Sequence, residues 1–359
     1  MDETVQKFLR NAGPVLCVDI GSGTQDALLA RPGLEGENWP RFVLPAPARL
    51  TAQRIRELTL LRRNIWLYGG NMGGGFTQAI KEHLAAGLAV FSTAPATRGI
   101  HDSEDVVRAL GVTISANCPE NCVPVFLTDY APDFWAGILR LASLPQPHLV
   151  LAAAQDHGFH VYNNRQGRMR GWSDLLTASA DPTSWIHAAP PPSLTRMQAL
   201  HEKTGGPVAD TGTSALLGAL CDPAVLERSF RQGLTIVNVG NGHTVAALLY
   251  QGKVRGIYEH HTGMRTREQL LEDLEQFRKH WLPAEAVQAS GGHGTAFGPA
   301  CEEAGGYAPT FITGPKRALL EGCGTFLAPH GDMMLAEDKL LDHITDYLCS
   351  SGYPGTRPA

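Results

Sequence analysis

The chain has 359 residues, of which 43% are hydrophobic and 18% are charged, and its formal net charge is −5. This size and composition suit a globular protein of two packed domains and exclude a disordered chain. The charge excludes the broad basic surface that nucleic-acid binding needs, and no apolar run approaches the roughly 18 residues that span a membrane. The start at Met1 is acidic and lacks an apolar signal core, so we expect a cytoplasmic protein.

Strands and helices alternate in the first part of the sequence. Short apolar runs predict the strands, and apolar residues at helical spacing predict the helices. The predicted strands are Val15–Ile20, Asp26–Ala30, Ile65–Tyr68 and Leu88–Phe91, and the predicted helices are Thr51–Arg63 and Phe76–Ala86. Such alternation is typical of a layered α/β domain.

The middle of the chain combines apolar strands with irregular segments. We expect buried strands at Val123–Leu127 and Leu149–Ala153, on either side of a helix at Asp133–Leu141. Asp181–Ser193 contains four prolines and predicts a stiff, extended connector. The other predictions here are a hairpin over Phe159–Trp172 and, on it, a solvated basic patch of Arg165, Arg168 and Arg170.

The last part of the chain predicts a helix of small residues, a three-stranded meander and two further helices. These elements are the helix Thr211–Leu220, the strands Thr235–Val239, Val245–Tyr250 and Val254–Glu259, the helix Arg265–Trp281 and a final helix from Gly331 to about Cys349. We therefore expect a first lobe with an irregular insertion and the proline-rich connector (1–208), a second lobe (209–330), a C-terminal connecting helix (331–351) and a tail (352–359).

One segment near the start of the sequence recurs in its second half. Val18–Leu29 (VDIGSGTQDALL) aligns with Val237–Leu249 (VNVGNGHTVAALL) across a one-residue gap, and Asp19 falls on Asn238. Each copy is an apolar strand, a polar residue, a Gly-x-Gly turn and a second apolar strand. Two copies this far apart, with none between them, predict a duplicated domain.

A glycine-tipped hairpin is suited to phosphate, because no Cβ blocks the approach of oxygens to its backbone N–H groups. A carboxylate at the strand end, Asp19, can hold Mg²⁺ through water. Two such hairpins, one per lobe, would clamp the phosphates of a nucleotide, and the alternative is two ordinary turns. The predicted phosphate-binding residues are Gly21, Ser22, Gly23, Thr24, Gly240, Asn241, Gly242, His243 and Thr244.

At these residues the sequence resembles the superfamily of actin, the sugar kinases and the heat-shock chaperone ATPases. The resemblance implies an α/β fold of two ribonuclease-H-like lobes with a cleft for ATP and Mg²⁺ between them. Ala209–Leu220 resembles the first connecting helix, where the chaperones have a catalytic acidic residue, here Asp210. Gly291 and Gly292 resemble the adenosine motif. Gly240–Val254 is similar to the second phosphate motif of acetate kinases, which implies phosphoryl transfer to a small acid.

Over its whole length the chain resembles a family labelled putative pyruvate formate-lyase activating enzyme. The resemblance rests on Gln155–Gly158, His261–Gly263 and Gly331–Met334. Such activators are radical enzymes that need Cys-x3-Cys-x2-Cys, whereas no third cysteine follows Cys118 and Cys122 at that spacing. We therefore expect no radical SAM chemistry and favour reduced thiols over a metal role for this pair.

Three further segments are candidates for the site. Gly69–Gly75 precedes a helix, whose N-terminus could bind an anion, or it is a flexible turn. Asp156 and His157 follow a buried strand, where ligands bind in α/β folds; Asp156 would be a general base or second Mg²⁺ ligand, and His157 would contact the acceptor. His260 and His261 would line the cleft or be structural.

These patterns favour an ATP-dependent kinase or ATPase in which Asp210 or Asp156 orients the acceptor or a water. The alternative is an ATP-gated switch that acts on a partner protein. Asn238 favours the switch, because many relatives have an acidic residue there and its loss would slow hydrolysis. We expect a small-molecule acceptor, with an anionic one as an option, and neither nucleic acid nor membrane as a partner. Glu337 is a second departure, since the family often has glycine there.

Overall fold

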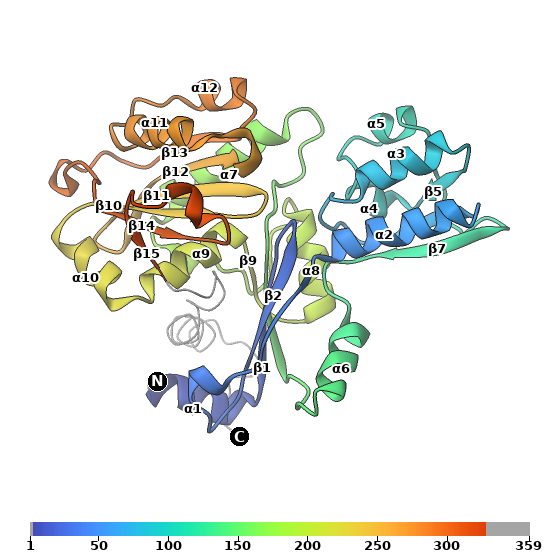
Figure 1. Ribbon diagram of the computed structural model, residues 1–359, viewed down its shortest axis with the longest axis horizontal. Coiled ribbons are helices and arrows are strands. Elements are labelled where there is room, and N and C mark those ends of the chain that lie inside the picture. The colour runs from blue at the N-terminus through green and yellow to red at the C-terminus, as the bar shows by residue number, and fades with distance from the viewer. Residues whose placement is uncertain (1–2, 328–359) are drawn as a thin grey trace.

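The computed structural model of the protein describes residues 3–327, with three β-sheets among them (Figure 1). The first sheet has the order β3-β2-β1-β8-β9. Its strands are β1 (Val15–Ile20), β2 (Thr24–Ala30), β3 (Arg41–Pro45), β8 (Leu149–Ala154) and β9 (Val208–Ala209). Neighbours β1, β2 and β3 pair antiparallel, whereas β8 joins β1, and β9 joins β8, in parallel. We call the part of the molecule around this sheet lobe I.

The second sheet repeats this arrangement and has the order β13-β12-β11-β10-β14-β15. Its strands are β10 (Leu234–Val239), β11 (His243–Tyr250), β12 (Lys253–His261), β13 (Gly294–Phe297), β14 (Thr310–Thr313) and β15 (Thr325–Phe326). Here too an antiparallel meander, β10 to β12, is continued from its first strand by two parallel strands. This is the ribonuclease-H-like pattern, present twice, so the two-lobed α/β fold predicted from the repeat is confirmed. We call the part around this sheet lobe II.

An insertion between β3 and β8 forms an ordered domain, which lies apart from both lobe sheets at the right of Figure 1. Its four parallel strands have the order β6-β5-β4-β7. They are β4 (Asn64–Gly69), β5 (Val90–Ser92), β6 (Val112–Ile114) and β7 (Cys122–Leu127), with helices α2 (Pro47–Leu60), α3 (Thr77–Ala85), α4 (Ala94–Thr97) and α5 (Glu104–Ala109). Its buried core draws only on residues 48 to 127. The sequence predicted β4, β5 and β7 but neither β6 nor the separate sheet that the four strands form.

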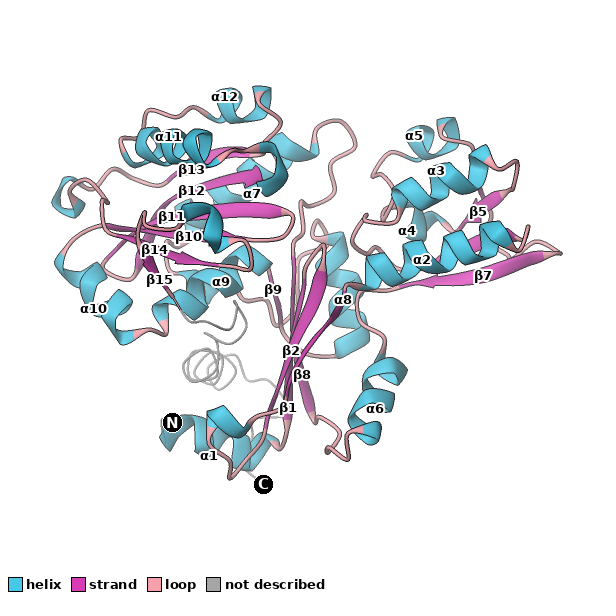
Figure 2. Ribbon diagram, viewed as in Figure 1, coloured by secondary structure: helices cyan, strands magenta, loops and turns pink. Residues whose placement is uncertain are grey.

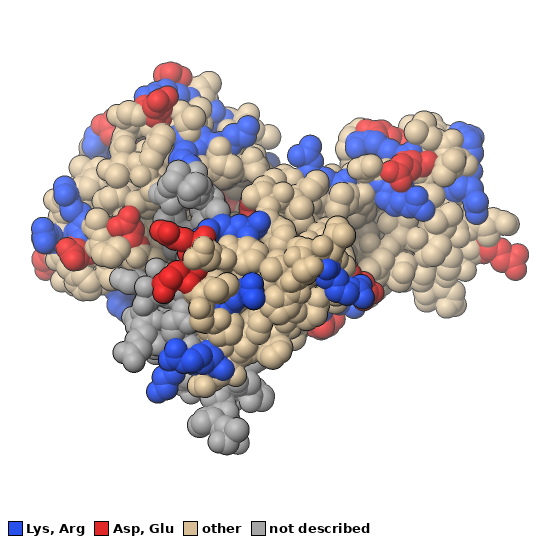
Figure 3. All heavy atoms as spheres, turned by 60° about the horizontal axis from the view of Figure 1, so that its bottom comes forward, with Lys and Arg blue, Asp and Glu red and all other residues tan. Residues whose placement is uncertain are grey.

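The other helices cover the two lobe sheets (Figure 2). They are α1 (Glu3–Ala12), α6 (Pro132–Leu141), α7 (Asn164–Ala178), α8 (Thr195–Thr204), α9 (Thr211–Leu220), α10 (Pro223–Arg231), α11 (Arg267–Arg278) and α12 (Ala284–Ala289). None of the helices within residues 3–327 has the length and apolar character needed to cross a membrane. On the face drawn in Figure 3, basic and acidic side chains are interspersed. The predicted helix from Gly331, the tail and Glu337 lie outside the described residues.

The predicted hairpin over Phe159–Trp172 is wrong, because α7 begins at Asn164 and is capped by the Asn163 side chain. The predicted solvated patch is wrong for Arg168, which is buried. Helix α7 follows a strand of lobe I but packs its buried Trp172 into the core of lobe II. A charged residue on the buried face obscures the apolar periodicity that would have revealed the helix.

The expected extended connector over Asp181–Ser193 is also wrong in its first part. Residues Pro182–Trp185 form a 3₁₀ turn, whose Asp181 side chain accepts from the Thr183 N–H at 3.0 Å. Trp185 is buried and packs against Trp172 with ring centroids 5.7 Å apart. The segment therefore returns the chain from lobe II to lobe I through a packed turn.

Candidate functional site

A cavity of about 460 Å³ lies where the two lobes and the insertion meet. Its walls come from both glycine-tipped hairpins, the loop after β4, the segment after β8 and the first turn of α9. The predicted residues among its lining are Asp19, Gly21, Ser22, Thr24, Asp156, His157, Asp210, Gly240, Asn241, Gly242 and His243. Elements far apart in the sequence therefore converge on one space.

The tips of the two hairpins contact each other, and residues of both tips line the cavity. A Cβ added at Gly23 would lie 3.1 Å from Nδ2 of Asn241, and one added at Gly242 would lie 2.5 Å from Oγ of Ser22. Neither glycine has a positive φ, so contact between the lobes, not backbone strain, is what restricts a side chain there. The repeat thus produces two hairpins that face one another, as a phosphate clamp requires. Thr244 instead turns inward, where its hydroxyl lies 3.0 Å from that of Thr262.

Two carboxylates lie side by side on the first hairpin. Asp19 on β1 pairs directly with Asp26 on β2, and both line the cavity. Asp19 accepts from the Thr211 hydroxyl at 2.8 Å, and Asp26 accepts from that of Thr24 at 3.0 Å. Burial raises the pKa of Asp26. The equivalent position in lobe II, Asn238, also lines the cavity, and its buried Oδ1 has no hydrogen-bond partner. This edge therefore offers three oxygen-bearing side chains.

Asp210 is held by Arg168 in a buried, two-point ion pair. The guanidinium donates to the two carboxylate oxygens at 2.6 and 2.9 Å, and Asp210 also accepts from the N–H of Gly212 as the N-cap of α9. The Nε of Arg168 donates to Glu259 at 2.8 Å. Burial alone would lower the pKa of Arg168, but the carboxylates of Asp210 and Glu259 raise it well above its usual value. Asp210 is thus a partner of a buried cation, which the sequence did not reveal.

Asp156 is equally engaged. Its Oδ1 accepts from Gly158 N–H at 2.8 Å, and its Oδ2 accepts from the N–H groups of Arg196 and Met197 at 3.0 and 2.9 Å. These bonds cap the first turn of α8. Burial raises the pKa of Asp156, while its hydrogen bonds oppose the rise. The predicted general base therefore also organises the wall of the cavity.

The glycine-rich loop Gly69–Gly75 ties the insertion to lobe I. Gly73 N–H donates to Asp129 at 3.3 Å, and Asp129 accepts from Arg196 at 2.6 and 3.0 Å. A Cβ at Gly70 would lie 2.8 Å from Cβ of Ala199, so α8 packs against the bare backbone. The loop still lines the cavity, which keeps it a candidate for contact with a ligand.

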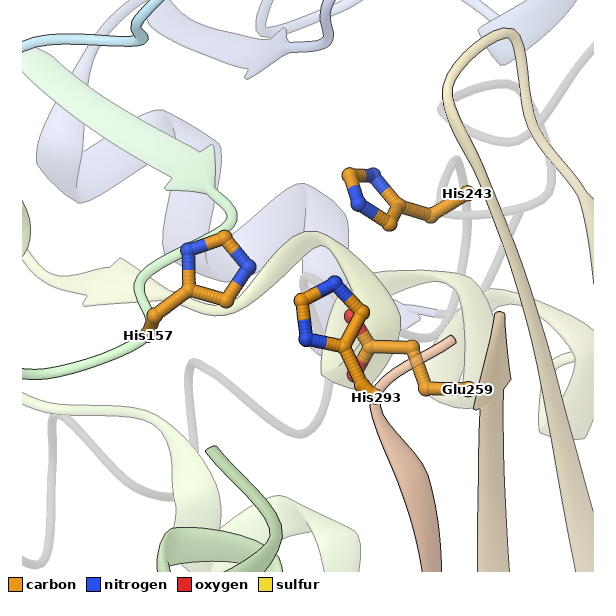
Figure 4. Close-up of side chains that lie close together, drawn as sticks. All are labelled: His157, His243, Glu259 and His293. Carbon is orange, nitrogen blue, oxygen red and sulfur yellow. The ribbon is translucent and has the colours of Figure 1, made fainter. Parts of the chain in front are cut away.

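Three histidines and a glutamate gather beside the cavity (Figure 4). Atoms of His157, His243, Glu259 and His293 that could bind a metal all lie within 4.8 Å of one another. His157 follows β8, His243 begins β11, Glu259 lies in β12 and His293 precedes β13. Burial lowers the pKa of all three histidines, to about 3 for His243 and about 4 for His293, so the rings are neutral. Sequence reasoning missed Glu259 and His293, because no local spacing connects these positions.

The predicted adenosine glycines do not line the cavity. A Cβ at Gly292 would lie 2.4 Å from the His260 ring, and one at Gly291 would lie 2.8 Å from the Met264 sulfur, so both pack within lobe II. His260 and His261 are also absent from the lining. Instead Pro315, just after β14, reaches the cavity, and a Cβ at Gly314 would lie 2.5 Å from Oδ1 of Asn238. The sequence analysis missed this part of the cavity wall, although the Gly314-Pro315 pair directly after β14 could have indicated it.

Comparisons with known proteins give one family and several remote structures. A model of the family described as "Putative pyruvate format-lyase activating enzyme (DUF1786)" matches residues 72–319. No curated protein sequence matches the chain. A Bacteroides thetaiotaomicron protein with actin-like ATPase fold and unknown function is 9% identical and covers 95% of this chain and 99% of its own, with a TM-score of 0.37. MreB 5 of Spiroplasma citri bound to AMPPNP is 9% identical and covers 95% of this chain and 99% of its own, with a TM-score of 0.35. An exopolyphosphatase-like protein is 12% identical and covers 83% of this chain and 65% of its own, with a TM-score of 0.29.

Proposed function

We propose that this chain, which belongs to the DUF1786 family, binds ATP with Mg²⁺ in the cavity between its lobes and acts on the terminal phosphoryl group as a kinase or ATPase. The observation that supports this is the pair of glycine-tipped hairpins that meet across the cavity. Backbone N–H groups at two opposed tips can bind phosphate oxygens from both sides. A volume of about 460 Å³ falls within the range of small-molecule sites, roughly 300–1,000 Å³.

The residues at the cavity edge fit Mg²⁺, which binds through oxygen and keeps several waters. Asp19 and Asp26 offer carboxylates at paired positions, and Asn238 offers a buried amide oxygen without a hydrogen-bond partner. An ion held there would neutralise charge on the phosphates between the hairpins. Where the resemblance implies an acidic residue, Asn238 would therefore still offer an oxygen donor.

A small acid is the acceptor that we favour. Arg98 and Arg196 line the same cavity as the carboxylates of the first hairpin, and Arg196 is already paired with Asp129, which leaves Arg98 as the candidate partner of an anion. The guanidinium of Arg98 lies 5.2 Å from the centre of the Phe159 ring, a contact that helps to hold it in place. A carboxylate acceptor could pair with this arginine while its oxygen faces the phosphates.

An ATP-gated switch is the second candidate, and one observation favours it. Both predicted general bases are occupied: Asp210 by Arg168, and Asp156 by three backbone N–H groups. Turnover without a free base would be slow, which suits a protein whose nucleotide state is recognised by a partner protein.

Calorimetry with ATP, in the presence and absence of Mg²⁺, tests the proposal. We expect the native chain to bind Mg-ATP, and Asp19→Ala to lose most of the Mg²⁺-dependent affinity while its circular dichroism stays unchanged. Asp133→Ala, which removes an exposed carboxylate from α6, is the matched control. Absence of Mg-ATP binding, or Asp19→Ala binding as tightly as the native chain, would overturn the proposal. Release of phosphate or its transfer to small acids then separates the enzyme from the switch.

A further inference from the structure

We propose that His157, His243 and His293 bind one first-row transition-metal dication, such as Zn²⁺, through ligands other than those proposed for Mg²⁺. One ring nitrogen of each histidine and one carboxylate oxygen of Glu259 lie within 4.8 Å of one another. In Figure 4 the rings approach one another from separate segments of the chain.

The first support is a concentration of buried nitrogen atoms that have no hydrogen-bond partner. These atoms are Nε2 of His157, Nε2 of His243 and both ring nitrogens of His293. His293 is only 3% exposed. Buried polar atoms in folded proteins are almost always satisfied, so such a group needs an explanation. A metal ion that accepts the lone pairs of the three rings supplies one.

The second support is the charge of the surroundings. Arg168 contributes one positive charge, and its two partners Glu259 and Asp210 contribute two negative charges, so the buried triad of these three residues favours a cation beside it. Glu259 is fixed in place, because it accepts from Arg168, Trp172 and Gln155.

The ligand set determines the class of metal. Neutral imidazoles suit Zn²⁺, Co²⁺, Ni²⁺ and Fe²⁺, whereas Mg²⁺ and Ca²⁺ prefer oxygen. Three histidine ligands leave a fourth position for water or a substrate atom, as in catalytic zinc sites. Nitrogens bound at about 2.0 Å to a tetrahedral ion lie about 3.3 Å apart, so binding would draw the histidine nitrogens, which lie within 4.8 Å of one another, together by at most about 1.5 Å.

The ion would connect the two lobes. His157 follows β8 of lobe I, whereas His243 and His293 belong to lobe II. His243 also stands at the tip of the second hairpin and lines the cavity. A bound metal would therefore hold this tip toward lobe I, beside the space proposed for the phosphates.

Metal titration without nucleotide tests this inference independently of the proposed function. We would remove metal with a chelator, add Zn²⁺, Co²⁺ or Mg²⁺ separately, and follow binding by calorimetry and by the visible absorption of bound Co²⁺. We expect one Zn²⁺ or Co²⁺ per chain, a Co²⁺ spectrum with nitrogen ligands, and no Mg²⁺ bound by the histidines. His293→Ala should weaken Zn²⁺ binding at least about 100-fold, since loss of supporting residues alone costs 10–100-fold.

The control is His148→Ala, which removes an exposed histidine and should leave Zn²⁺ affinity unchanged. If His293→Ala does not fold, His157→Ala replaces it, because His157 lies in a loop. The inference is overturned if the native chain takes up no stoichiometric Zn²⁺ or Co²⁺. It is equally overturned if folded His157→Ala and His243→Ala bind these ions as tightly as the native chain does.

Discussion

Arg168 is the residue on which the interior of the site depends. It is buried and bonds to Asp210 and Glu259, and its guanidinium lies 4.5 Å from the centre of the Trp172 ring. A buried ion pair adds little net stability, but the removal of one partner leaves an uncompensated charge. The structural cost of losing Arg168 therefore exceeds that of losing any surface arginine.

We expect Arg168→Met to lower the free energy of unfolding by about 3–5 kcal/mol, because two buried carboxylates lose their cation. Urea denaturation followed by circular dichroism measures the change. Arg108→Ala, which breaks an exposed ion pair with Glu104, should change the free energy by no more than about 1 kcal/mol. Equal effects of the two substitutions would contradict the structural role of Arg168.

At the residue scale the sequence predicted the repeated hairpins and the strand-end residues Asp156 and His157, but it missed the partners that these residues meet only after folding. Asp19 and Asn238 were found because one segment occurs twice. Arg168, Glu259 and His293 come from a helix, a strand and a loop that meet only after folding. A single sequence contains no local pattern that reveals which distant residues come into contact.

At the scale of elements, the contact between the two hairpins carries the functional proposal. We expect Gly242→Val to weaken Mg-ATP binding by at least about tenfold, about 1.4 kcal/mol. Its Cβ would lie 2.5 Å from Oγ of Ser22 and force the tips apart. Calorimetry is the measurement, and Ser22→Gly in the same chain should restore part of the affinity.

Gly263→Val is the control for that experiment, because a Cβ at Gly263 meets no atom within 4 Å. It should bind Mg-ATP as the native chain does. Native affinity in Gly242→Val would show that the tips need not approach each other for binding.

The pairing of β8 with β9 depends on a second glycine. A Cβ at Gly206 would lie 1.9 Å from the backbone oxygen of Val150. We therefore expect Gly206→Ala to destabilise the protein by about 1–3 kcal/mol, as overpacked cores are destabilised. Thermal unfolding is the measurement. Gly137→Ala in α6, where a Cβ meets nothing within 4 Å, should be neutral or stabilising, and a matching loss there would refute the steric explanation.

Several regular elements were predicted, but β3, α8, α10 and the buried charged helix α7 were not. The small residues of Thr211–Leu220 gave the bounds of α9 as the structure has them. Helix α7 was missed, because its buried face includes Arg168 and Gly167 beside Met169 and Trp172. Asp210 and Glu259, which lie elsewhere in the sequence, stabilise Arg168 on that face, and the local sequence does not indicate them.

At the scale of the whole molecule, the insertion has the properties of an independent domain. Its core is confined to residues 48–127, whereas contacts such as Asp129–Arg196 attach it to lobe I. We expect residues 46–130 alone to unfold cooperatively in urea, as measured by circular dichroism. Phe76→Ala, which removes a fully buried ring at a cost of about 3–5 kcal/mol, should abolish that transition. A gradual, non-cooperative loss of signal in the native segment would disprove its independence.

The duplication was visible in the sequence, but the path between its two halves was not. After β8 the chain enters lobe II as α7, returns to lobe I as α8 and β9, and crosses again through α9. Each lobe is therefore built from residues on both sides of position 190. A protease that cuts once near Pro190 would yield two fragments that remain interlocked, and neither would contain a complete lobe. If the two fragments were produced separately, neither could fold a complete lobe alone, and each lobe would form only when both fragments associate.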